Sequence, residues 1–488
     1  MAKNALARPA GEGARSRSAT SITRRAASAA CLVLALIGGA RSLWGADDAP
    51  RPIVSTEPPA AFPAEATPSA LVTAPVARED ALEALPSAQL DLAEIDAIMA
   101  KALRGGRTPG AVVIVGRRDG VVFRRAYGRR AIIPQREEMS VDTIFDLASL
   151  TKPLVVGSLI QWLVQEGRLD IRRRVVEYLP EFGVREKYLV TVEQLLLHTS
   201  GLPPTNSLND FKHGPERARA LTLGGWLYKR SGREFIYSDI GYIALGEMIE
   251  AITGERLDHT AERVIFGPLG MRDTGYCPEL CADPRVAPTE LNYGWLKNPI
   301  RGEASDTRAH RLGGVAGNAG LFSTADDLAR FARMLLSQGE LDGMRVLNPA
   351  SVSELMRPRA VPRAKRTLGF DVSSGFSSGR GHHLSELAIG HSGYTGTSFW
   401  VDPVLDLFVI FLSNRNHPFS TGKVTDVQAQ VTDAAVRALR SEGVRQAALP
   451  SSGAPGAPDS AADAPPPSGV QVPSGESLPS PSSASSGG

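Results

Sequence analysis

The sequence carries little net charge, and this absence excludes one class of partner. Its 488 residues include 54 basic and 52 acidic side chains, so the formal net charge is only +2. Domains that bind nucleic acid usually concentrate Lys and Arg on one face. No block of basic residues and no zinc-ligand pattern occurs along the chain, so we expect no nucleic-acid partner.

Cysteine is scarce as well, which limits redox and metal chemistry. Cys31 lies in an N-terminal apolar run, and Cys277 and Cys281 share the segment "CPELC". Two thiols without a nearby His or Cys pair are too few for a zinc site. In an oxidising compartment they would close a small disulfide loop, and two unpaired loop thiols are the equally weighted alternative. Neither arrangement makes them catalytic.

The N-terminal apolar run is too short for a comfortable membrane span. The run "AACLVLALIGGA" has roughly a dozen residues, whereas a spanning helix needs about 20. Arg24 and Arg25 precede it and small residues follow it, which is the pattern of an export signal over residues 1–46. Cleavage after Ala40 and cleavage after Ala46 both fit. We therefore expect a periplasmic or secreted protein, with an uncleaved membrane anchor as the alternative.

Composition divides the remainder of the chain. Residues 47–90 are rich in Pro and Ala without a sustained period, as in a linker. Residues 441–488 consist largely of Pro, Ser, Gly and Ala, and such a segment buries too little apolar surface to fold. The folded domain is therefore expected over 91–440, a length that can bury a large core.

Apolar spacing within this domain predicts helices in its middle and strands near both ends. Helical spacing runs from Leu92 to Leu103, from Ser149 to Arg168, and along a last helix from Val424 to Leu439. Two further helices are expected to start at the capping box of Thr191 and Gln194, and at Ser323 with Asp326. The segment "AVVIVGRRDGVVFRRAYG" reads as a hairpin, and "ELAIGH", "TSFWVD" and "LDLFVIFLSN" read as late strands. The fold class is therefore α/β of the α+β type: an antiparallel sheet from the two chain ends, flanked by helices, with a mainly helical insertion.

A serine and a lysine stand three residues apart where the helix from Ser149 begins. Ser149 and Lys152, in "SLTK", would share one helix face. A serine hydroxyl needs a base to act as a nucleophile. Burial and the positive end of the helix are expected to lower the pKa of Lys152 from about 10.4 toward neutrality. A helix-capping serine with a surface lysine is the structural alternative.

The same spacing elsewhere shows that the motif is weak alone. Ser420 and Lys423 also match it, but they follow Pro418 in a polar loop without an apolar frame, and we interpret them as loop residues. Two later motifs support Ser149 instead: "YSD" at Tyr237 precedes an apolar helix, and "HSG" at His391 ends a strand. A phenol beside a lysine can exchange protons with a nucleophile.

Together, "SLTK", "YSD" and "HSG" resemble the motifs of the penicillin-recognising serine hydrolases, which include class C β-lactamases, D,D-carboxypeptidases, D-aminopeptidases and related esterases. The resemblance extends over the domain through "LLLHTSGL", "YSDIGYIALGE", "GGVAGNAGLFSTADDLARF" and "GHSGYTGTSFWVDP". It implies acyl transfer through a covalent acyl-enzyme that water releases, without a metal or organic cofactor. The substrate would be a small molecule or peptide with an ester, amide or β-lactam bond, and the cell envelope would be a further partner.

The resemblance also implies a role for each motif residue. Ser149 would be the acylated nucleophile, Lys152 its base partner, and Tyr237 the group that carries the proton to the leaving group. Backbone N–H groups of Ser149 and Tyr394 would form the oxyanion hole. Two further residues, His391 and Ser392, would orient the substrate from an edge strand, where Gly393 would let the substrate backbone approach.

Two positions depart from the β-lactamase pattern. The tyrosine motif often ends in asparagine there, whereas it ends in Asp239 here, and an ionised carboxylate cannot donate a hydrogen bond to a substrate amide. The third motif begins with His391 rather than lysine, so a substrate carboxylate would be held more weakly. Both changes favour an esterase or peptidase over an efficient β-lactamase.

Two more polar residues near these motifs are interpreted as structural. His198, in "LLLHTSGL", is expected near a helix end rather than in a catalytic triad, since Ser149 already has a lysine. Asn318, in the Gly-rich segment "VAGNAG", is expected in a plain turn, and a loop that borders the site is the alternative. No glutamate suggests deacylation of the class A type.

Three functions follow from these motifs. The first is an exported serine hydrolase that acts on an ester or amide. The second is a cell-wall D,D-carboxypeptidase, a penicillin-binding protein or a β-lactamase. The third is a binding or sensor protein on the same fold that no longer forms an acyl-enzyme, and the intact Ser149, Lys152 and Tyr237 argue against it.

Overall fold

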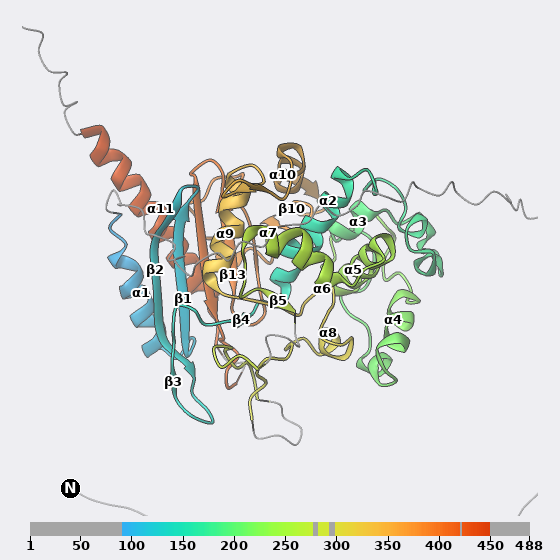
Figure 1. Ribbon diagram of the computed structural model, residues 1–488, viewed down its shortest axis with the longest axis horizontal. Coiled ribbons are helices and arrows are strands. Elements are labelled where there is room, and N and C mark those ends of the chain that lie inside the picture. Colours follow the sequence, from blue (N-terminus) through green and yellow to red (C-terminus); the bar gives the residue numbers. More distant parts are fainter. Residues whose placement is uncertain (1–89, 277–281, 292–297, 420–421, 449–488) are drawn as a thin grey trace, which may run out of the picture. The chain divides into compact units, whose positions relative to one another are not determined.

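The computed structural model describes residues 90–276, 282–291, 298–419 and 422–448. Within these residues, the main sheet has the strand order β3-β2-β1-β14-β13-β12-β11-β10-β9, and its pairings are antiparallel. Its strands are β1 (Gly110–Arg117), β2 (Gly120–Ala131), β3 (Glu137–Glu138), β9 (Arg359–Val361), β10 (Ala364–Arg366), β11 (Asp371–Ser373), β12 (Ile389–Ser392), β13 (Ser398–Asp402) and β14 (Leu407–Ser413). Strands from both ends of the domain therefore meet in one sheet (Figure 1), which confirms the predicted fold class.

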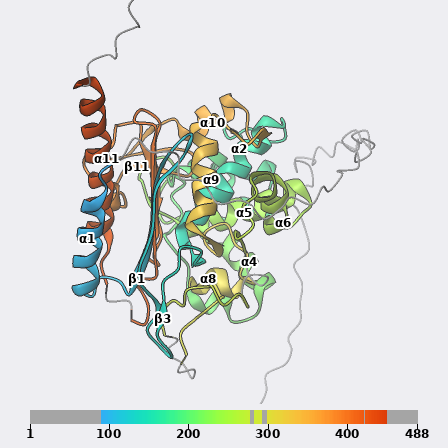
Figure 2. The ribbon, with the colours of Figure 1, turned by 60° about the vertical axis from the view of Figure 1, so that its left-hand side comes forward.

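Helices cover both faces of this sheet. The first and last helices, α1 (Ala93–Arg104) and α11 (Thr425–Ala448), pack together on one face, and α9 (Ala325–Leu336) packs on the other (Figure 2). Strand β14 is buried along its whole length. Alternate residues of that strand enter the two apolar clusters on opposite faces. A continuous apolar run such as "LFVIFL" is what a strand covered on both faces requires.

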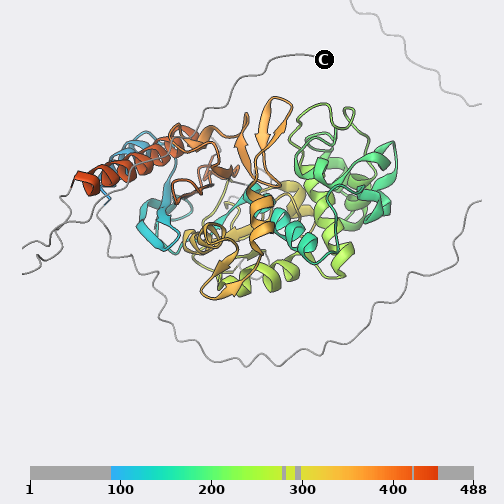
Figure 3. The ribbon, with the colours of Figure 1, turned by 90° about the horizontal axis from the view of Figure 1, so that it is seen from above.

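The segment between β3 and β9 is mainly helical and lies on the α9 side of the sheet (Figure 3). Its α-helices are α2 (Ser158–Gln165), α3 (Val192–Leu196), α4 (Pro215–Leu223), α5 (Asp239–Thr253), α6 (Leu257–Ala261), α7 (Gly267–Leu269), α8 (Thr307–Arg311), α9 and α10 (Pro349–Met356). Shorter helical turns are η1 (Ala148–Leu150), η2 (Lys152–Gly157), η3 (Val175–Glu177), η4 (Pro180–Gly183), η5 (Lys187–Leu189), η6 (Leu208–Phe211) and η7 (Glu262–Phe266), with η8 (Ser378–Arg380) after β11. Two small sheets join β4 (Phe145–Asp146), β5 (Gly275–Tyr276) and β6 (Leu321–Ser323), and β7 (Glu340–Leu341) with β8 (Met344–Arg345).

Three predicted boundaries are wrong or incomplete. The helix expected over 149–168 begins as a 3₁₀ turn, continues as a π-helical turn and ends as α2 at Gln165. The expected cap at Ser323 is displaced by one residue: Thr324 caps α9 by accepting a hydrogen bond from the Asp327 N–H, because Ser323 still belongs to β6. Helix α11 continues eight residues past 440, to Ala448, since no proline interrupts it before Pro450.

One further prediction is confirmed, and others concern residues outside the described structure. The capping box of Thr191 and Gln194 is present at the start of α3. The predicted export signal, the predicted linker up to residue 89 and the "CPELC" cysteines lie outside the described residues. Within the described part of the chain, every helix is too short or too polar to cross a membrane.

Candidate active site

A strained turn places Ser149 at the start of η1. Ala148, the preceding residue, has φ of 47°, a left-handed conformation that is costly for a residue with a Cβ. The turn is held by Asp146, whose Oδ1 accepts the Ala148 N–H at 2.8 Å and whose Oδ2 accepts the Ser305 N–H at 2.8 Å. Thr151 adds a hydrogen bond from its hydroxyl to the Ala148 carbonyl at 2.7 Å. These neighbouring side chains therefore stabilise the strained backbone that orients Ser149.

Lys152 lies behind Ser149 and is fully buried. Its Nζ is 3.1 Å from Ser149 Oγ, 2.8 Å from the Asn318 carbonyl oxygen and 2.8 Å from Asp239 Oδ1. An ammonium group has three protons to donate, and here it meets three acceptors. The contact that the three-residue spacing predicts is thus present, and Lys152 is held as a cation.

The expected lowering of the Lys152 pKa is wrong. Burial is the largest single effect and does lower the pKa of Lys152, but the charge and hydrogen bonds of Asp239 and Tyr237 outweigh it. The pKa of Lys152 is therefore raised above its ordinary value. The sequence reasoning counted burial and the helix terminus but not a carboxylate at 2.8 Å.

Asp239 is available to Lys152 because a neighbour caps the helix. Ser238 is the N-cap of α5 and accepts a hydrogen bond from the Gly241 N–H. The carboxylate of Asp239 therefore contacts the lysine, at the position where the β-lactamase pattern often has an asparagine.

Tyr237 is held between two rings. Its ring stacks on His198 with centroids 4.4 Å apart and lies 4.6 Å from the ring of Phe376 on the other side. The Nδ1 of buried His198 accepts the Ser238 N–H at 3.0 Å. Burial lowers the pKa of His198 well below its ordinary value, so this ring is neutral. His198 has a structural role, as predicted, and that role is to support the Tyr237 segment.

His391 gives strand β12 a neutral acceptor at the cavity. Its Nδ1 lies 2.9 Å from the Ser392 carbonyl oxygen, which assigns the proton to Nδ1 and leaves Nε2 as an acceptor. Within the described residues, this buried Nε2 and the hydroxyl oxygen of Ser392 have no hydrogen-bond partner. Burial, with the nearby Arg366 and Lys152, lowers the pKa of His391 well below its ordinary value. His391 is therefore uncharged near neutrality.

The position of β12 corrects the edge-strand prediction. β12 is an inner strand, but its only residue pair with β11 in the described structure joins Asp371 and Gly390. His391 and Ser392 lie beyond that pair, so their β11 side is open.

Gly393 lets two segments of the chain's own backbone pack closely. A Cβ at this position would lie 2.5 Å from the Leu147 carbonyl oxygen and 2.1 Å from Thr397 Oγ1. Thr395 and Thr397 donate hydrogen bonds to the carbonyl oxygens of Asp146 at 2.7 Å and Leu147 at 3.2 Å. The turn between β12 and β13 is thereby fastened to the segment that carries Ser149.

These residues share one cavity of about 590 Å³. Of the predicted site residues, Ser149, Tyr237, Asp239, His391, Ser392, Gly393 and Tyr394 line the cavity, and Lys152 reaches it through Ser149. Asn318 also lines it, and its carbonyl holds Lys152, so its interpretation as a plain turn residue is wrong. Phe376, Glu290 and Asp306 line the cavity too, and the only lining Lys or Arg in the described chain is Arg308.

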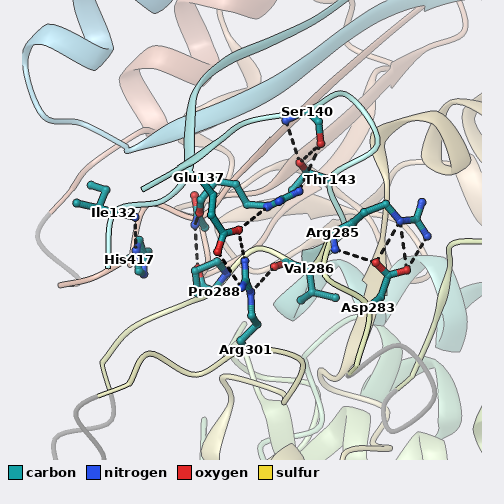
Figure 4. Close-up of polar contacts among 12 residues, drawn as sticks. Ile132, Glu137, Ser140, Thr143, Asp283, Arg285, Val286, Pro288, Arg301 and His417 are labelled. Carbon is teal, nitrogen blue, oxygen red and sulfur yellow. Dashed lines mark hydrogen bonds and ion pairs between the residues drawn. The ribbon is translucent and has the colours of Figure 1, made fainter. Parts of the chain in front are cut away.

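One wall of the cavity contains Glu290, and the loop that carries it is hydrogen-bonded to the region of β2 and β3. Arg301 donates to Glu137 Oε1 at 3.0 Å and to the Val286 carbonyl at 2.8 Å (Figure 4). His417 Nε2 accepts the Ile132 N–H at 2.9 Å in the same region. Sequence reasoning missed this wall, Asp146 and Phe376, because no local pattern shows which loops meet across the sheet.

Comparison with known proteins identifies relatives of this chain. The family model described as Beta-lactamase matches residues 95–468. A protein of Bacillus subtilis named N-acetylmuramyl-L-alanine amidase is 30% identical over 365 residues, covering 67% of this chain and 81% of its own. A putative D-alanyl-D-alanine carboxypeptidase of Escherichia coli is 28% identical over 343 residues, covering 63% and 79%.

Solved structures show the same fold. EstCE1, a hydrolase with promiscuous acyltransferase activity, superposes with a TM-score of 0.58 at 20% identity, covering 71% of this chain and 98% of its own. The match to the Beta-lactamase family model spans more than half of the sequence and includes every predicted catalytic residue. The chain therefore belongs to the beta-lactamase family of serine hydrolases.

Proposed function

We propose that this protein is an exported amidase that cleaves a peptide–glycan amide in cell-wall fragments through an acyl-enzyme on Ser149. The observation that carries the proposal is the neutral substrate-facing strand: His391 offers an acceptor and no charge where a cation would hold a carboxylate. A D,D-carboxypeptidase releases an amino acid whose free carboxylate adjoins the cleaved bond. An acceptor at that place suits a substrate N–H instead.

The relatives support the same choice of bond. The amidase relative is named for the bond between N-acetylmuramic acid and L-alanine. Its acyl part is an uncharged lactyl sugar, and its leaving group is a peptide amine. The export signal is consistent with a substrate outside the cytoplasm.

In the proposed acylation, Ser149 Oγ bonds to the amide carbon and its proton moves to Lys152. Because the lysine already donates to three acceptors, it passes a proton to Asp239 in the same step. The N–H groups of Ser149 and Tyr394 stabilise the oxyanion. When the C–N bond breaks, Tyr237 gives its proton to the leaving nitrogen and regains one from Asp239 through Lys152.

Water completes the reaction. It attacks the acyl-enzyme carbon, its proton moves along the same groups, and the C–O bond to Ser149 breaks as Ser149 regains a proton. The products are a carboxylic acid and an amine, so atoms and charges balance without an oxidant or a reductant.

The test combines labelling with a substrate panel. We expect a fluorophosphonate to add one adduct to the intact protein, detected by mass spectrometry, and Ser149→Ala to abolish it. Ser420→Ala is the matched control, since Ser420 has the same spacing to a lysine, and it should label normally. N-acetylmuramyl-L-alanyl peptides should be hydrolysed faster than peptides ending in D-Ala-D-Ala.

Other outcomes decide against the proposal. Labelling retained in Ser149→Ala would rule out this nucleophile, and no adduct at all would favour a binding protein. A D,D-carboxypeptidase is the second candidate, because Arg308 lines the cavity and a named carboxypeptidase is a relative. Preference for D-Ala-D-Ala peptides, with a persistent penicillin adduct, would establish that candidate instead.

A further inference from the structure

Three exposed aromatic side chains belong to two adjoining segments of the helical part, outside the active-site cavity. Tyr188, Trp226 and Tyr228 are exposed by 53%, 63% and 65%. Tyr188 and Tyr228 line a groove of about 960 Å³. Single exposed aromatic residues are ordinary, but a cluster in a groove indicates a binding surface.

Hydrogen bonds fix the two segments that carry these rings. The buried Lys187 donates through Nζ to the Leu223 carbonyl, which joins η5 to the end of α4. The N–H groups of Tyr228 and Lys229 both donate to the Gly201 carbonyl, at 2.8 and 3.0 Å. Ser231 donates to Gln194 Oε1 at 2.8 Å. These hydrogen bonds fix the backbone of both segments, and the rings that they carry are exposed at the surface.

Cations surround the same rings. The guanidinium of Arg185 lies 4.9 Å from the centroid of Trp226, and Nζ of Lys229 lies 5.4 Å from that of Tyr228. Arg230 and Arg233 line the groove, and neither has an ion-pair partner in the described chain. We call these three rings and four cations the aromatic–cationic surface.

Among the described residues that line the groove, Glu186 is the only carboxylate beside Lys229, Arg230 and Arg233. Glu234 lies 3.6 Å from Lys229. The surface therefore keeps a positive excess although the whole chain is nearly neutral.

We propose that the aromatic–cationic surface binds an anionic polysaccharide. The apolar faces of sugar rings stack on aromatic side chains, as other planar or apolar groups do, and Arg side chains pair with carboxylates. A purely apolar protein partner would leave Arg230 and Arg233 buried without counter-charges, which is costly. An acidic glycan satisfies both the rings and the cations.

The identity of this glycan rests on the proposed function. Each amide cleaved at N-acetylmuramic acid leaves a lactyl carboxylate on the sugar, so the product strand becomes a polyanion. The segment with Arg233 leads within four residues to Tyr237. A strand held here would keep further amides at high effective concentration near Ser149.

The experiment measures binding without turnover. Full-length protein with Ser149→Ala is titrated with soluble peptide-free glycan strands of alternating N-acetylglucosamine and N-acetylmuramic acid. Trp226→Ala with Tyr228→Ala, and separately Arg230→Gln with Arg233→Gln, should each raise Kd at least tenfold. The charge pair should also reduce the salt dependence of binding.

Matched controls separate this surface from general charge effects. Arg104→Gln with Arg136→Gln removes two exposed arginines elsewhere and should leave Kd unchanged. In the wild-type background, both surface double variants should hydrolyse p-nitrophenyl butyrate normally, which shows intact folding.

Three results would overturn the inference: unchanged Kd in both surface variants, an equal loss in the control pair, or equally tight binding of oligothymidylate of matched charge. Glycan binding that depends on the surface, in a protein without amidase activity, would retain this inference and reject the proposed function.

Discussion

At Lys152, burial and charge act on one ammonium group in opposite directions. Burial favours the neutral amine, whereas the Asp239 carboxylate at 2.8 Å favours the cation and prevails. A protonated lysine cannot accept the proton of Ser149 unless it releases one of its own. The carboxylate at this position can take up that proton, whereas the asparagine side chain of the β-lactamase pattern cannot.

Replacing this carboxylate should change the pH dependence of catalysis. In Asp239→Asn the burial of Lys152 is opposed only by Tyr237, so the pKa of Lys152 falls, but its proton must leave to solvent. We expect kcat/KM at pH 7 to decrease by about a hundredfold or more, the scale of lost acid–base catalysis. Activity of the variant should rise with pH, whereas that of the wild type should stay nearly flat from about pH 6 to 8, as measured by ester hydrolysis.

A carboxylate in the same cavity provides the control. Asp306 accepts hydrogen bonds from Ala309 N–H and the Asn318 amide rather than from Lys152. Asp306→Asn should keep the wild-type shape of the profile. A wild-type pH profile in Asp239→Asn would show that Asp239 does not accept a proton during catalysis.

Among the elements, the turn between β12 and β13 couples the sheet to the nucleophile. Gly393 brings this turn against the Leu147 carbonyl, and Thr395 and Thr397 bind the two carbonyls before Ala148. Strand β12 and Ser149 therefore keep a fixed separation although they lie more than 200 residues apart in sequence.

Adding one methyl group at this turn should disturb catalysis. The Cβ of Gly393→Ala would overlap backbone at 2.5 Å, and relief of the clash must move the turn or Ser149. We expect kcat/KM to fall at least tenfold and the free energy of unfolding to drop by about 1–3 kcal/mol, as for overpacked cores.

Gly375→Ala is the matched control, because Gly375 also lines the cavity and a Cβ there meets nothing within 4 Å. It should retain activity and stability in the same kinetic and urea-unfolding measurements. Equal losses in both variants would mean that any bulk in the cavity, rather than the Leu147 contact, reduces the rate.

Across the whole molecule, the sheet is closed by helices on both faces, and α9 adds a buried carboxyl group to that core. Asp327 accepts hydrogen bonds from Asp273 N–H at 2.8 Å and Thr274 Oγ1 at 2.7 Å. Burial nevertheless raises the pKa of Asp327 from 3.8 to about 7. The folded state therefore binds a proton more tightly than the unfolded state between these values.

The contribution of Asp327 to the free energy of unfolding should accordingly be present at low pH and decline as the pH rises toward 7. Asp327→Asn cannot ionise, so it should gain stability relative to the wild type between pH 5 and pH 8, by about 2 kcal/mol. Urea unfolding at both pH values measures this difference. Asp142→Asn, at an exposed carboxylate, should track the wild type, and a pH-independent gap for Asp327→Asn would contradict the raised pKa.

Patterns local in sequence predicted most of the fold. Apolar spacing located α1, the β1–β2 hairpin and the three late strands, because each spacing reflects burial of one or both faces. The strands β9 and β10, of three residues each, escaped prediction since they are too short to show a period. The cap at Thr324 was missed by one residue because Ser323 has an equally suitable side chain.

The sequence by itself determined the family and the motif residues Ser149, Lys152, Tyr237 and His391, since each motif is a short run of neighbouring positions and together they resemble one family. Only the tertiary structure decided their charge states. The pKa of Lys152 depends on Asp239, which is 87 positions away in sequence yet 2.8 Å away in space, and His391 is neutral because distant segments bury it. Electrostatic energies depend on distance and burial through space, and no local pattern contains either quantity.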